Sequence, residues 1–122
     1  MGKSVLAQRS AVASRILKAM SNPRRLQALY EMHGGECSVG DLVERIGISQ
    51  SAMSQHLARL RSTGIVTTRR DAQTIYYSLG SAEARAILET LYGLYAESMT
   101  EAKKPRARRG AGTDGSVTES AA

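Results

Sequence analysis

The sequence predicts a mainly α-helical domain that carries one small β-hairpin. Apolar residues recur at helical spacing through residue 60, alternate with polar residues over positions 74–79, and return to helical spacing after position 81. The 122 residues are the length of one small domain. The expected order is therefore four helices, two strands and a final helix (α-α-α-α-β-β-α).

The first two helices are predicted from apolar stripes and from a boundary signal between them. The first stripe consists of Val5, Leu6, Val12, Ile16, Leu17 and Met20. Asn22-Pro23 marks the start of the second helix, because Asn is a favoured N-cap and Pro fits a first turn. The apolar face of this helix consists of Leu26, Leu29 and Tyr30. Gly34-Gly35 is expected to end it.

Two short helices joined by a tight turn are predicted over residues 38–62. Ser38 and Ser49 are the expected N-caps, and Gly47 and Gly64 the expected stops. The inward faces consist of Val39, Leu42, Val43 and Ile46 in one helix and Met53, Leu57 and Leu60 in the other. Ile48 is the apolar residue of the turn. This pattern is typical of a helix-turn-helix unit.

A hairpin and one more helix complete the domain. Residues 65–69 and 74–79 are rich in β-branched and aromatic residues, and Asp71-Ala72-Gln73 is the expected turn between them. Ser81 caps the last helix, whose apolar side consists of Ile87, Leu88, Leu91, Leu94 and Tyr95. A hairpin directly after a helix-turn-helix makes the predicted fold a winged helix-turn-helix.

The charge balance favours an acidic partner. The chain holds 17 Lys and Arg against 11 Asp and Glu, a net charge of +6, which points first to nucleic acid. No apolar run approaches the roughly 18–20 residues of a membrane span, and the N-terminus lacks an apolar signal core. A single cysteine rules out an intramolecular disulfide. We expect a cytoplasmic protein without a membrane partner.

The predicted helix after Ser49 presents a narrow polar face opposite its apolar one. A face of small polar side chains fits a major groove, where Gln pairs with adenine and Ser bonds most base edges. The alternative to a DNA contact is that this polar face is an ordinary solvent-exposed helix face. The predicted contacts to double-stranded DNA are Ser49, Gln50, Ser51, Ser54, Gln55, His56, Arg59 and Arg61 on the helix and Arg69, Arg70 and Gln73 on the hairpin. His56 also has a second interpretation, as a packed or capping residue.

The composition changes near residue 100. Residues 1–100 are expected to form the DNA-binding and dimerisation domain, and 101–122 a basic, disordered tail without Leu, Ile or aromatic residues. Positions 103–109 carry five positive charges. Such a tail either adds non-specific affinity for DNA or only solubilises the chain.

Three segments resemble the ArsR/SmtB family of winged-helix repressors, and the third narrows the likeness to its NolR/BigR/HlyU-like branch. They are AMSNPRRL at 19–26, SQSAMSQHLARL at 49–60 and RRDAQTIYYSL at 69–79, within a match over 12–97. The resemblance implies a homodimer, formed by the first and last helices, that represses promoters at inverted-repeat operators. The apolar stripes of both helices are wider than a lone small core needs. The expected dimer contacts are Val5, Val12, Ile16, Leu88, Leu91, Tyr92 and Tyr95.

Metal sensing is not expected, and no cofactor is predicted. Metal-sensing relatives carry Cys-Val-Cys-Asp-Leu in the third helix, where this chain has SVGDL at 38–42. A second family site uses histidines and carboxylates along the last helix, but residues 81–98 contain no histidine. A tight site for a soft metal needs three or four suitable ligands.

Cys37 has two interpretations. Sulfur-sensing relatives pair a cysteine near this point with one at the end of the last helix, where this chain has Ala96. Cys37 is then either a small apolar plug, or a thiolate whose pKa the following helix lowers and which still accepts a persulfide. A repressor with no thiol or metal input is the alternative to a redox-responsive or sulfide-responsive one.

Other classes of function are weaker. The sequence lacks a Gly-rich phosphate loop, a His/Glu metal motif and a nucleophile motif, so an enzyme is not expected. A non-specific architectural nucleic-acid binder would rely on the tail. A protein-interaction module would keep the fold without reading DNA.

Overall fold

The computed structural model describes residues 2–103. The tail at 104–122, which falls within the stretch predicted to be disordered, lies outside the described residues. The elements in chain order are α1 (Gly2–Met20), α2 (Pro23–His33), β1 (Cys37–Ser38), α3 (Val39–Ile46), α4 (Gln50–Ser62), β2 (Val66–Asp71), β3 (Thr74–Leu79) and α5 (Ala82–Lys103). The predicted order of helices and strands is confirmed, with one added strand, and α5 runs past the expected domain boundary at residue 100.

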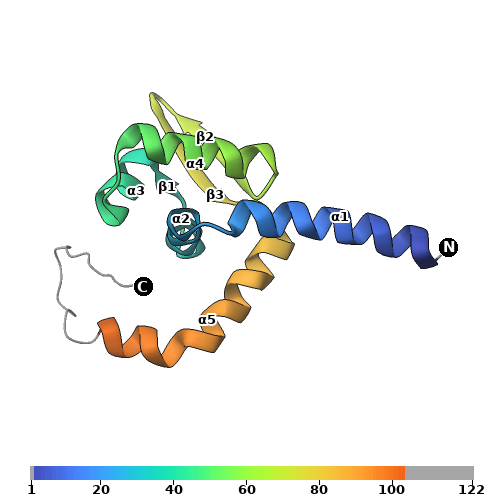
Figure 1. The fold of residues 1–122 in the computed structure, drawn as a ribbon. Helices are drawn as coiled ribbons and strands as arrows, with labels where there is room; N and C mark the ends of the chain where they lie inside the picture. Colours follow the sequence, from blue (N-terminus) through green and yellow to red (C-terminus); the bar gives the residue numbers. More distant parts are fainter. Residues whose placement is uncertain (1, 104–122) are drawn as a thin grey trace.

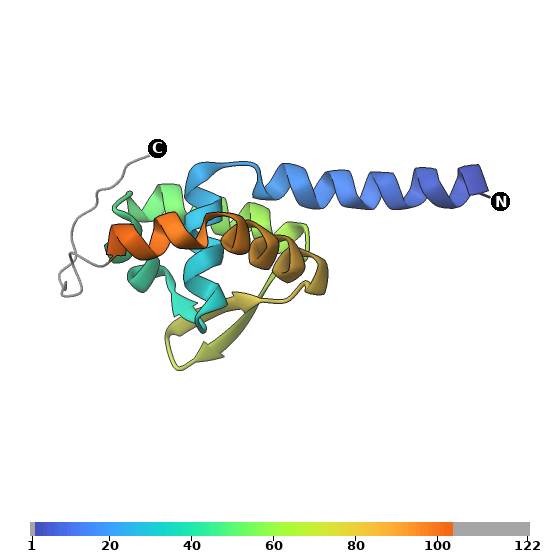
Figure 2. The ribbon, with the colours of Figure 1, turned by 90° about the horizontal axis from the view of Figure 1, so that it is seen from below.

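Helix α1 extends away from the rest of the domain. Figures 1 and 2 show it leaving the body that α2, α3, α4 and the sheet form, and Figure 1 shows the later turns of α5 lying apart from that body as well. Residues 4–15 of α1 are all exposed, whereas Ala19 and Met20 in its last turn are buried. The direction of α1 within one protomer is therefore set at its C-terminal end.

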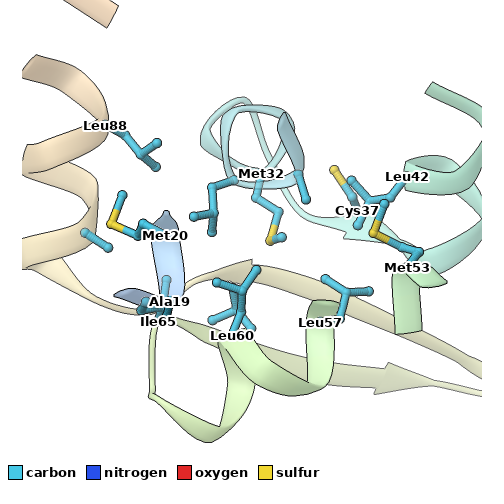
Figure 3. Packing of buried hydrophobic residues seen from close by; sticks show 14 residues of the cluster. Ala19, Met20, Met32, Cys37, Leu42, Met53, Leu57, Leu60, Ile65 and Leu88 are labelled. Atoms are coloured by element: carbon cyan, nitrogen blue, oxygen red, sulfur yellow. The ribbon is translucent and has the colours of Figure 1, made fainter. Parts of the chain in front are cut away.

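The core gathers apolar side chains from all five helices and from the sheet. Leu57 and Leu60 of α4 point toward α2, and Leu88 of α5 closes one side (Figure 3). The fully buried residues are Ala19, Met20, Ala28, Leu29, Met32, Cys37, Leu42, Met53, Leu57, Leu60, Ile65, Val66, Ala84 and Leu88. Among the described residues the core holds no charged side chain.

The helix boundaries follow the caps that the sequence predicts. The Asn22 side chain accepts hydrogen bonds from the first backbone amides of α2. Ser38 forms a reciprocal capping box with Asp41, and Ser49 accepts from the Ala52 amide. Gly47 ends α3 with a φ of 85°, a left-handed conformation that glycine adopts without strain. Each cap stabilises its helix by about 1 kcal/mol.

The sheet has a strand that the sequence analysis missed. Its order is β1-β3-β2, and the two-residue β1 pairs antiparallel with β3, placing Cys37 opposite Tyr77. Two residues are too short to show an alternating pattern. The hairpin turn is also tighter than predicted, because β2 continues to Asp71 and only Ala72 and Gln73 connect the strands.

Leu57→Ala is expected to destabilise the protein by about 2–5 kcal/mol, because it leaves a cavity where α4 meets the core. The measurement is urea unfolding followed by circular dichroism at one fixed protein concentration. Ser54→Ala, on the exposed side of the same helix, is the control and is expected to stay within about 0.5 kcal/mol of the wild type. Equal losses for both variants would contradict the packing described here.

Candidate nucleic-acid interface

Helix α4 separates its apolar and polar residues onto opposite faces. Met53, Leu57 and Leu60 are 0% exposed and hold the helix against the core. Of the predicted DNA contacts within α4 itself, the exposed ones are Gln50, Ser51, Ser54, Gln55, Arg59 and Arg61, and outside α4 Ser49, Arg69, Arg70 and Gln73 are exposed too. A rigid helix with a polar outer face and arginines in its last turn has the shape and charge that suit a major groove.

Ser49 has a structural task before any contact with DNA. Its hydroxyl accepts a hydrogen bond from the Ala52 amide at 3.1 Å and lies 3.4 Å from the Ser51 hydroxyl. The cap sets where α4 starts and which side chains follow on its first turn. The residue therefore positions the exposed polar face of α4.

His56 is packed rather than presented. It is half-buried, and its Nδ1 lies 3.2 Å from Nη1 of Arg25. Because arginine can only donate, Nδ1 must accept, which assigns the neutral imidazole with its proton on Nε2. Burial, followed by the charges of Arg25 and Arg24, lowers the pKa of His56. The geometry favours the packing interpretation of His56 over a base contact.

The two arginines of the wing differ in their surroundings. Arg69 donates to both carboxylate oxygens of Glu36, its Nε lying 3.1 Å from Oε1, and its guanidinium lies 4.8 Å from the Tyr76 ring centroid. This hydrogen bonding raises the pKa of Arg69 and lowers that of Glu36. Arg70 is exposed and takes part in none of the ion pairs found among residues 2–103. Arg70 is thus the better placed of the two to meet a phosphate.

The expected dimer contacts divide into surface and core residues. Leu88 is 1% exposed because it packs under α2 in the protomer's own core, so the expectation that it forms a dimer contact is corrected. Val5, Val12, Tyr92 and Tyr95 are exposed. Ile16 and Leu91 are partly buried. Four of the seven residues therefore offer an open apolar surface on α1 and α5.

Cys37 occupies a core position. It is 1% exposed, beside Leu42 and Met53 in Figure 3, and its Sγ donates to the Gly35 carbonyl oxygen at 3.4 Å. Burial raises the pKa of the thiol, although Arg45 near the sulfur acts in the opposite direction. Of the two interpretations of Cys37, the small apolar plug is therefore favoured over the reactive thiolate, since loss of hydration acts against the charged form.

The remaining titratable side chains do not form a metal site in the described part of the chain. No group of three or more His, Cys, Asp or Glu residues is placed to hold an ion there. His33 instead pairs with Glu89, its Nε2 lying 3.1 Å from the carboxylate.

Within residues 2–103, no helix combines the length and apolar character needed to cross a membrane.

A capped short helix, a glycine turn, an exposed polar helix and a basic hairpin together define a winged helix-turn-helix regulator. The family model for bacterial regulatory proteins of the arsR family matches residues 22–68. The transcriptional activator HlyU of Vibrio cholerae serotype O1 is 48% identical over 80% of this chain and 91% of its own length. The chain belongs to the arsR family of bacterial regulatory proteins. It is a transcriptional regulator and not an enzyme.

Further relatives and solved structures agree with this assignment. The nodulation protein NolR of Rhizobium meliloti is 46% identical, covering 82% of this chain and 83% of that protein. The biofilm growth-associated repressor of Xylella fastidiosa (strain Temecula1) is 38% identical, and the match covers 78% of this chain and 83% of that protein. Reduced HlyU from Vibrio cholerae has a TM-score of 0.71 at 51% identity, covering 74% and 95%. A homodimeric winged helix-turn-helix DNA-binding domain from Mycobacterium bovis has a TM-score of 0.67 at 26% identity, covering 78% and 88%.

A plot of log K against log salt concentration for duplex DNA has a negative slope. Arg70→Ala is expected to make this slope shallower by about 0.9, the value for one lost phosphate contact. Arg69→Ala is expected to change this slope less, because Glu36 already compensates its charge. Fluorescence anisotropy titrations at several salt concentrations measure both slopes. Equal changes for the two variants would show that DNA displaces Glu36 from Arg69.

Cys37 is expected to react with iodoacetamide about tenfold or more slowly in the native protein than in the urea-unfolded chain, because the thiol is buried in the core and burial raises its pKa. Mass spectrometry at timed intervals gives both rates. The unfolded chain serves as the control for intrinsic thiol reactivity. Equal rates would contradict the core position of this thiol.

Proposed function

We propose that this regulator is a homodimeric repressor that binds an inverted-repeat operator with one α4 helix from each protomer. The observation that carries the proposal is the exposed polar face of α4, held rigidly by three fully buried side chains. Two such helices lie about 34–36 Å apart when they read successive major grooves on one side of B-DNA. The net charge of +6 supports binding to the phosphate backbone.

Dimerisation is supported by the apolar residues that one protomer leaves exposed. They lie on α1 and α5 and include Val5, Leu6, Val12, Leu17, Tyr92, Leu94 and Tyr95. An unpaired surface of this kind is unusual on a monomeric protein and is typical of a subunit interface. A two-fold axis through this interface would match the symmetry of an inverted repeat.

Repression is the proposed direction of regulation. A bound dimer that covers promoter DNA blocks transcription without needing any further surface. The relatives carry both kinds of name, since HlyU is called an activator and the Xylella fastidiosa protein a repressor. We place the protein in the cytoplasm, with the DNA it would bind. Residues 1–100 would form the working domain, and the basic tail would add non-specific affinity.

We propose no disulfide input to this repressor. Cys37 is the sole cysteine of the sequence, so it has no partner within the protomer for a disulfide. Its burial and raised pKa also oppose the thiolate form that reactive sulfur species attack. These properties favour a repressor without a thiol switch over a redox-responsive or sulfide-responsive one.

Gln55→Ala is expected to reduce the discrimination between a selected operator and a scrambled duplex by about 1–3 kcal/mol, because it removes a paired hydrogen bond to a base edge. The operator is first selected by the wild-type protein from a randomised inverted-repeat library. Fluorescence anisotropy then gives both affinities at one salt concentration. The affinity for the scrambled duplex is expected to stay unchanged.

Two outcomes would overturn parts of this proposal. Equal wild-type affinity for the selected and scrambled duplexes would favour an architectural nucleic-acid binder. In vitro transcription from a promoter that carries the selected site tests the direction of regulation. An increase in transcript on adding the protein would replace repression by activation.

A further inference from the structure

The side chain of Arg25 joins the end of α1 to the recognition helix. It leaves the first turn of α2, and its Nε donates to the carbonyl oxygen of Ala19 in the last turn of α1 at 2.5 Å. Its Nη1 lies 3.2 Å from Nδ1 of His56 on α4. We call this set of contacts, from the Ala19 carbonyl through the Arg25 guanidinium to the His56 imidazole, the Arg25 link.

On the α1 side, the Arg25 link acts where the direction of the helix is decided. The last carbonyl groups of a helix lack partners within it, and a cation near them is favoured by the helix dipole. Because residues 4–15 are exposed, the rest of α1 makes little contact with its own protomer. Figure 1 shows the helix leaving the body at this end. The guanidinium therefore holds the C-terminal end of α1, where a small change of angle moves the exposed N-terminal turns of this helix by a large distance.

On the α4 side, the Arg25 link reaches the middle of the recognition helix. His56 lies in sequence between exposed Gln55 and buried Leu57, at the border of the two faces of α4. Arg25 is half-buried, and burial followed by the charge of Arg59 lowers its pKa. Arginine stays protonated despite such a shift, and its planar fork serves both acceptors at once. Lysine would keep the charge and lose this geometry.

We propose that Arg25 is a positioning residue for DNA binding, which fixes the angle between α1 and α4 and thereby the separation of the two recognition helices in the dimer. The inference rests on the proposed dimeric function, since α1 is there part of the subunit interface. Arg25 acts through its neighbours and touches no DNA. Loss of the Arg25 side chain allows each α4 helix to turn relative to the two-fold axis of the dimer. The dimer then no longer prefers one spacing between the two half-sites.

The test compares Arg25→Lys and Arg25→Ala with Arg24→Ala, a matched control one residue away whose side chain is exposed and bonds Gln27 instead. Duplexes carry the selected half-sites at spacings that differ by single base pairs. For both Arg25 variants we expect at least tenfold weaker binding at the preferred spacing and a flatter dependence on spacing. The salt slope and the affinity for a scrambled duplex are expected to match the wild type. Arg24→Ala is expected to keep the spacing preference.

The pH profile is a second readout. The charged groups around the His56 imidazole are Arg25 and Arg24 of α2, and Arg59 of α4 acts on Arg25. When His56 is protonated, its Nδ1 no longer accepts a hydrogen bond and the ring carries the same charge as Arg25. The Arg25 link is therefore intact above the usual histidine pKa of about 6.5. It is lost as the pH falls through the lowered pKa that His56 has in the folded protein. Operator affinity is expected to fall with it. His56→Gln, whose amide oxygen accepts at every pH, is expected to remove this step.

Several results would overturn the inference. Arg25→Lys with wild-type spacing preference would show that the Arg25 link does not set the geometry. A uniform loss on all duplexes, with a salt slope reduced by about 0.9, would make Arg25 a phosphate contact. If Arg25→Ala does not fold, Arg25→Lys and His56→Gln still decide the question.

A measurement without DNA separates the inference from the proposed function. Nitroxide labels are placed at Ala58→Cys in a Cys37→Ala background, and pulsed electron resonance gives the distance between the two α4 helices. Arg25→Lys is expected to broaden this distribution, and an unchanged distribution would refute the positioning role. Failure of the wild type to select any operator would refute the proposed function, whereas the label distances would still test the Arg25 link.

Discussion

The structure depends on one constraint, which is that α4 must anchor the core with one face and leave its opposite, polar face exposed. Met53, Leu57 and Leu60 are completely buried, and the residues between them are exposed except for the half-buried His56. A helix held by three buried side chains cannot roll without opening a cavity, so its polar face keeps one orientation. The short α3, stopped at Gly47, and the hairpin after Gly64 both pack around this fixed helix. The orientation of the polar face of α4 thus follows from core packing.

The charged side chains near this surface fall into two groups. Arg25 and Arg69 are engaged within the domain, by the Ala19 carbonyl and His56 in one case and by Glu36 and Tyr76 in the other. Arg70 and the arginines in the last turn of α4 are exposed. The first group makes contacts within the domain, and the second lies at the surface, where the proposed contacts to phosphates would form. A count of basic residues alone would treat all of them alike.

The cysteine illustrates why local sequence position misleads about reactivity. Cys37 directly precedes the N-cap of α3, which predicts a stabilised thiolate. The chain instead turns at this point into β1, which pairs with β3 and directs the sulfur into the core. Desolvation then dominates and raises the pKa. The two-residue strand β1 is too short to show a periodic signal. Its pairing partner, Tyr77, lies forty residues away, so a local pattern does not reveal the pairing either.

Sequence patterns alone were enough to predict the five helices and the hairpin in order, the helix caps at Asn22, Ser38 and Ser49, and the polar face of α4, because these follow from local capping and from residue periodicity. The folded chain was needed to show that β1 joins the sheet, that Leu88 belongs to the protomer core, that Cys37 is a buried thiol, and that His56 and Arg25 meet. Each of these depends on which distant element packs against a residue. A helical period states which residues share a face, but the partner of that face is set by three-dimensional packing.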